Sequence, residues 1–181
     1  RLNNFEAGSF SETTTASFST DFYLGSEDDD DAGVDTDDAF AAGYSFQIDL
    51  NTSFTGEDSL DISLDAGTQG PGNVSDLLDL NSAGDGLRVD GVKYTFPIGD
   101  KTTAFFGIDS DGNSLFSSGC VYGGPSDMLD DCGNVNAGIT GGGVAVGAGY
   151  DFGNGLTAAI GAQTTEASVF TQESQDAYAL N

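Results

Sequence analysis

The feature that most constrains the fold is the two-residue alternation of side chains between residues 40 and 54. Successive side chains of a β-strand point to opposite faces, so this alternation predicts a strand with one apolar and one polar face. Globular strands have about 5–6 residues, whereas a tilted strand that crosses a bilayer needs roughly 9–11. Length and pattern together therefore predict a wall strand of a transmembrane β-barrel, apolar outside and wet inside. The apolar face carries Phe40, Ala42, Tyr44, Phe46, Ile48, Leu50 and Phe54.

Seven or eight segments of this kind follow one another along the chain, at about residues 15–24, 40–54, 60–66, 87–98, 102–108, 144–152, 156–164 and 177–180. The connections between them alternate in length. Short ones lie near residues 57, 100 and 154, and long ones at 25–38, 67–86, 109–142 and 165–176. Outer-membrane barrels place short turns on the inner side and long loops on the outer side. We therefore expect residues 1–181 to form one all-β domain, an antiparallel up-and-down transmembrane β-barrel or a sector of a larger one.

Two expected strands fit this pattern poorly. Leu87 and Val89 have the opposite parity to Val92 in the same segment, which predicts either a β-bulge near Gly91 or a strand that starts later. Phe105 and Phe106 are adjacent, so the pattern does not assign the faces of that strand.

Composition excludes several function classes. Thirty acidic residues against four basic ones leave a net charge of −26. Binding a polyphosphate needs a basic surface, so we expect no nucleic-acid partner. The chain has no His and no evident nucleophile–base pair, so we predict that it is not an enzyme and requires no cofactor.

The polar faces supply candidate pore-lining residues: Asp21, Gln47, Asp49, Asn51, Asp61, Asp65, Lys93 and Asp151, with Ser45, Ser63, Thr95 and Gln163 beside them. Acidic groups outnumber basic ones, and a low-dielectric wall focuses their negative potential, which predicts a preference for cations. In the alternative interpretation these carboxylates only solvate the lumen, and a constriction loop that the sequence does not locate sets the selectivity.

Two acidic segments are candidate cation-binding sites. The run Asp28, Asp29, Asp30 and Asp31 could collect Ca²⁺ or other divalent cations, since hard cations take carboxylate oxygens, or it could be a solvated, self-repelling loop. Asp109, Asp111 and Asn113 resemble part of a calcium loop but lack its third acidic position and distal Glu. They form either a simple turn or a calcium site.

The two cysteines, Cys120 and Cys132, lie in a stretch rich in Gly, Ser and Asp. They could form a loop disulfide in an oxidising compartment or remain free thiols. A zinc site is improbable, because the chain has no His and no third Cys.

Three segments, at residues 4–11, 44–58 and 94–100, resemble the porin domain of cyanobacterial outer-membrane porins of the iron-uptake or carbohydrate type. The run Asp-Leu-Asn-Thr-Ser-Phe-Thr-Gly-Glu-Asp at residues 49–58 is the most specific of them, and the resemblance spans about residues 4–165. It implies an outer-membrane location in contact with lipid, passive diffusion of small solutes or inorganic ions, and a homotrimer. Barrels of that family have about twice as many strands as this chain offers, so we expect part of a longer barrel or a shortened relative.

A structural protein is the competing hypothesis. An extracellular β-rich filament or matrix subunit that assembles by pairing exposed strand edges, with calcium on its acidic loops, would also have two-faced strands and a charged surface.

Overall fold

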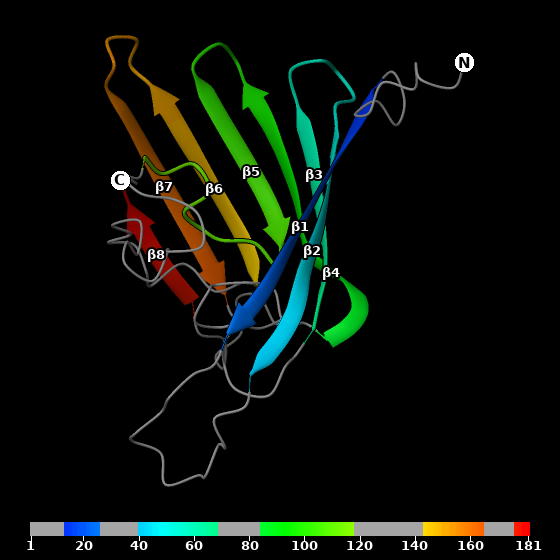
Figure 1. Cartoon of the computed structure of the whole chain (residues 1–181). Coiled ribbons are helices and arrows are strands. Elements are labelled where there is room, and N and C mark those ends of the chain that lie inside the picture. The colour runs from blue at the N-terminus through cyan, green and yellow to red at the C-terminus, as the bar shows by residue number, and fades with distance from the viewer. Residues whose placement is uncertain (1–12, 26–39, 69–83, 118–142, 165–175) are drawn as a thin grey trace, which may run out of the picture.

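The computed structural model describes residues 13–25, 40–68, 84–117, 143–164 and 176–181. These residues form one antiparallel β-sheet of eight strands, and each strand pairs with the next one along the chain (Figure 1). The described residues contain no helix, so the prediction of an all-β, up-and-down antiparallel fold is confirmed. The strands are β1 (Thr14–Gly25), β2 (Ala41–Thr52), β3 (Ser59–Gly67), β4 (Gly84–Ile98), β5 (Thr102–Ile108), β6 (Val144–Asp151), β7 (Thr157–Thr164) and β8 (Asp176–Leu180).

The strand register carries the two-faced pattern across the whole sheet. One row of neighbouring residues crosses all eight strands without a charge, and the next row, on the opposite face, is largely polar. The uncharged row comprises Thr14, Thr52, Leu60, Tyr94, Phe106, Val146, Ala162 and Tyr178. The opposite row comprises Thr15, Asn51, Asp61, Lys93, Gly107, Ala145, Gln163 and Ala177. We call the first face the apolar face and the second the inner face.

The register also resolves the two strands that fitted poorly. Gly91 pairs with Ser63 and Val89 with Leu64, so Asp90 is an extra residue that bulges out of β4. This β-bulge restores Leu87 and Val89 to the apolar face, where both are exposed, as one of the two predictions required. In β5, Phe105 is 3% exposed on the inner face, whereas Phe106 is 47% exposed on the apolar face.

The first expected strand is shorter than its pattern indicated. β2 ends at Thr52, and Phe40 and Phe54, which the alternation assigned to it, lie just outside the strand. Phe54 leaves the strand because its backbone N–H, like that of Thr55, donates to the carboxylate of Asp58 at 2.7–2.9 Å. The Phe54 ring still contacts the Tyr94 ring, with 6.2 Å between the centroids.

Asp58 organises the turn between β2 and β3. Its Oδ1 also accepts hydrogen bonds from the hydroxyls of Ser53 and Thr55, and its Oδ2 accepts one at 2.7 Å from the hydroxyl of Tyr94 on β4. The backbone N–H of Thr55 is the largest of the influences that hold the pKa of Asp58 well below its usual value of 3.8, since these donors favour the ionised form. The buried carboxylate therefore fastens the turn to the third strand of the sheet.

The three short connections, at residues 53–58, 99–101 and 152–156, lie at one end of the sheet (Figure 1). Gly153 and Gly155 have φ of 91° and 79°, a conformation that side chains rarely adopt, and they allow the tight turn between β6 and β7. The alternation of short and long connections is thus as expected.

Strands β1 and β8 are the two edges of the sheet. Among the described residues they do not pair with each other, so the sheet is not closed into a barrel. The part of the chain that the structure describes holds no helix of the length and apolarity that crossing a membrane requires.

Candidate functional site

The chain folds back over the inner face directly after β5. Residues 109–117, which we call the inward segment, cross β6 and β7 (Figure 1). The backbone N–H of Gly112 donates to Oε1 of Gln163 on β7 at 2.9 Å, in a buried position. At its end, the N–H of Ser117 donates to Oδ1 of Asn181 at 3.0 Å, and Asn181 Nδ2 donates to the Ser117 carbonyl at 3.3 Å.

Small residues of the inner face make room for this segment and for Phe105. A Cβ at Gly91 would lie 2.7 Å from the carbonyl oxygen of Asp109, and one at Gly147 would lie 2.4 Å from Cε1 of Phe105. Real Cβ atoms do not come so close to other heavy atoms, so both glycines are required by packing. The half of the inner face formed by β5–β7 is therefore filled, and it carries the buried Phe105, Ala145, Ala159, Gln163 and Thr164.

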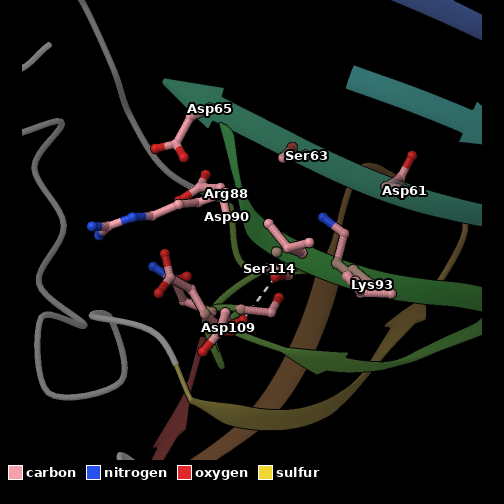
Figure 2. A pocket seen from close by; sticks show the side chains of 14 residues that line it. Asp61, Ser63, Asp65, Arg88, Asp90, Lys93, Asp109 and Ser114 are labelled. Carbon is pink, nitrogen blue, oxygen red and sulfur yellow. Dashed lines mark hydrogen bonds between the residues drawn. The ribbon is translucent and has the colours of Figure 1, made fainter. Parts of the chain in front are cut away.

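A polar hollow remains between the inward segment and strands β3 and β4. Its volume is about 800 Å³. Figure 2 shows the side chains around it, which come from β3, from the bulged part of β4 and from the inward segment. They include Asp61, Ser63, Asp65, Arg88, Asp90, Lys93, Asp109, Ser110, Asp111, Asn113 and Ser114.

Acidic groups dominate the hollow, with five carboxylates against two cationic side chains. Lys93 lies opposite Asp61 in the register and Arg88 lies opposite Asp65. The bulged Asp90 adds a carboxylate without a register partner on β3, and it lies within electrostatic reach of Asp65, Asp109, Asp49 and Asp111. The hollow therefore has an excess of negative charge.

Hydrogen bonds order the polar side chains that lie beside the hollow on β2 and β3. Asp49 Oδ1 accepts from Nε2 of Gln47 at 2.9 Å and from the hydroxyl of Ser63 at 2.7 Å. Asn51 donates to Ser59 and to Asp61, and Ser59 donates to Asp61 at 2.9 Å. These bonds hold the carboxylates on the inner face in fixed orientations.

The predicted pore-lining residues divide into three groups. Asp61, Asp65 and Lys93 line the hollow, and Gln47, Asp49 and Asn51 lie beside it on the same face. Asp21 lies on the same face of β1, opposite Ser45 and outside the hollow. Asp151 lies at the end of β6, where it accepts a hydrogen bond from the N–H of Gly153 and shapes the turn.

The predicted cation-binding residues are described only in part. Asp109, Asp111 and Asn113 line the hollow. No three acidic, His or Cys side chains in the described ranges gather closely enough to hold one metal ion. The run Asp28, Asp29, Asp30 and Asp31 and the cysteines Cys120 and Cys132 lie outside the described residues.

Sequence reasoning missed Arg88, Asp90, Ser110 and Ser114 as residues of this site. Simple parity placed Arg88 and Asp90 on the face opposite to the pore-lining set, but the bulge turns both toward the hollow. The parity break at Leu87 and Val89 was the signal that could have located them.

Comparisons with protein-family descriptions, with curated proteins and with solved structures find no match to this chain.

Proposed function

We propose that this chain forms part of the wall of an outer-membrane pore that lets small solutes or inorganic ions diffuse passively, with a preference for cations. The observation that carries the proposal is the chemical difference between the two faces of one continuous sheet. The resemblance to cyanobacterial porins points to the same function, location and trimeric assembly.

The apolar face supports contact with hydrocarbon. It exposes large apolar side chains at many points of the sheet, among them Phe18 at 67%, Phe22 at 83% and Leu180 at 77%. A soluble monomer rarely exposes apolar patches of more than a few hundred Å², and a much larger one indicates a protein or membrane partner. Outer-membrane barrels meet lipid with such a face and water with the other.

The inner face supports solute passage. It carries the acidic hollow, and the inward segment narrows the space in front of it. Eight strands alone enclose an interior that side chains fill, whereas an aqueous channel takes about 16. We therefore propose that further strands, from the same polypeptide or from neighbouring copies, complete the wall at β1 and β8. Open edges in lipid would leave backbone groups unsatisfied at several kcal/mol each.

Reversal potentials in a salt gradient test this function. The chain is reconstituted in a planar bilayer with different KCl concentrations on the two sides, and we expect a reversal potential that indicates preference for K⁺. Replacing Asp109 and Asp111 by Asn should reduce that preference, whereas Asp100→Asn, in the exposed turn between β4 and β5, should leave it unchanged. Preference for Cl⁻ in the unmodified chain would end the proposal of a cation-preferring pore.

The unpaired edges favour a second candidate function. β1 and β8 present backbone donors and acceptors that could pair with other copies, as in an extracellular filament or matrix subunit, with calcium on the acidic loops. Extraction separates the two functions. A porin needs detergent and migrates differently on a gel before and after heating, whereas a filament subunit is recovered as polymer without detergent.

A further inference from the structure

The hollow contains a carboxylate that the described residues do not satisfy. Asp65 is 7% exposed, lines the hollow and points into it (Figure 2). Within the described ranges, no group donates a hydrogen bond to this carboxylate or forms an ion pair with it, and its register neighbour Arg88 is no exception. A buried charged group without a partner costs more than any other polar side chain, so Asp65 indicates that a ligand with donors enters the hollow.

The surrounding charges define the sign of that ligand. The five carboxylates of the hollow outnumber its two cationic side chains. They also come from three separate segments, β3, the bulge of β4 and the inward segment. No three of them in the described part of the chain lie close enough to share one metal ion. A ligand that satisfies several of them must therefore carry positive charges that stand apart.

The remaining lining favours an organic molecule over a compact ion. The volume of about 800 Å³ lies within the roughly 300–1,000 Å³ of small-molecule sites. Val89 and Val92 also line the hollow and offer apolar contact to methylene groups. Ser110 and Ser114 provide hydroxyl oxygens that accept hydrogen bonds from ammonium groups.

We propose that the hollow binds elongated organic cations with two or more separated ammonium groups, one of which pairs with Asp65. The inference rests on the proposed function in that it names a solute class for the same inner face. Ammonium–carboxylate hydrogen bonds are about twice as strong as neutral ones, so Asp65 contributes strongly to affinity.

Calorimetric titration of the full chain in detergent tests this inference with three probes: 1,4-diaminobutane, Mg²⁺ at the same ionic strength, and n-butylamine. The diamine and Mg²⁺ carry equal charge, so their comparison isolates the spacing of the charges. We expect the diamine to bind roughly tenfold more tightly than either of the other two. Asp65→Asn should weaken its binding about tenfold, which corresponds to about 1.4 kcal/mol.

Asp21→Asn is the matched control, because it removes a carboxylate from the same face outside the hollow, and it should leave the affinity unchanged. If Asp65→Asn does not fold, as judged by circular dichroism, Asp109→Asn takes its place. Equal losses in Asp21→Asn and Asp65→Asn would reduce the binding to general charge and overturn the inference. Mg²⁺ binding as tight as that of the diamine would do the same.

The two proposals fail in different ways. Absence of diamine binding in a chain that still conducts cations overturns the ligand class and leaves the pore standing. Diamine binding that depends on Asp65, in a chain that forms no pore, supports the site and removes the proposed function.

Discussion

The hydrogen bond between Gly112 and Gln163 holds the inward segment against β7, and its loss should release that segment. Gln163 is 4% exposed, and its Oε1 accepts the Gly112 N–H at 2.9 Å. Gln163→Met keeps the length of the side chain and removes the acceptor, which leaves a buried N–H unsatisfied. Such a loss costs about 1–3 kcal/mol.

That cost translates into a change in population. A difference of about 1–3 kcal/mol raises the fraction of molecules with a detached segment roughly 5- to 150-fold. The remaining anchors, at Ser117 and Asn181, are exposed and each contribute less. Limited proteolysis should therefore cut Gln163→Met within residues 109–117 faster than the unmodified chain, because cleavage follows the open population. In planar bilayers the same variant should show added conductance levels.

Gln47→Met is the control for this prediction. It removes a glutamine from the same face that donates to Asp49 and does not contact the inward segment. Proteolysis of the segment at the same rate in Gln163→Met and in the unmodified chain would refute the anchoring role. So would equal acceleration in Gln47→Met.

Two further predictions concern packing and pH. Gly147→Ala should destabilise the sheet by about 1–3 kcal/mol in denaturant unfolding, because its Cβ would lie 2.7 Å from the backbone oxygen of Ile160 as well as against Phe105. Gly149→Ala, two residues along the same face, meets Leu115 no closer than 3.7 Å and should be nearly neutral; equal effects of the two would contradict the placement of Phe105. Asp58→Asn should lower stability at pH 7, and its difference from the unmodified chain should shrink as pH falls below 3.8, since a lowered pKa stabilises the fold only while the group is ionised. A difference that stays constant from pH 7 to about pH 2, or one that Asp100→Asn reproduces, would show that the Asp58 network does not act through its charge.

The alternation of side chains predicted most of the fold because it is a local property. Each strand candidate carries its own record of which face is apolar, and the short turns near residues 57, 100 and 154 then impose antiparallel neighbours. The parity break in β4 likewise signalled the bulge at Asp90 before the register located it.

The inner face was less predictable, because long-range contacts determine it. The bond between Gly112 and Gln163 joins residues 51 positions apart, and no local pattern in residues 109–117 distinguishes an inward segment from an external loop. The two phenylalanines of β5 are equivalent in sequence and differ only because Gly147 leaves room for Phe105. The hollow depends on both features, so its position follows from packing across the sheet.

The central claim is that the two faces of this sheet meet hydrocarbon and water respectively, and adjacent residues of β1 test it most directly. The chain contains no Trp, so Phe18→Trp and Ser19→Trp each create a single fluorescent probe, one on each face of an exposed strand. In vesicles that contain brominated lipid, we expect quenching of the probe at position 18 by the lipid and of the probe at position 19 by aqueous iodide. If iodide quenched both probes, or if neither quencher reached position 18, the sheet would not be a membrane wall.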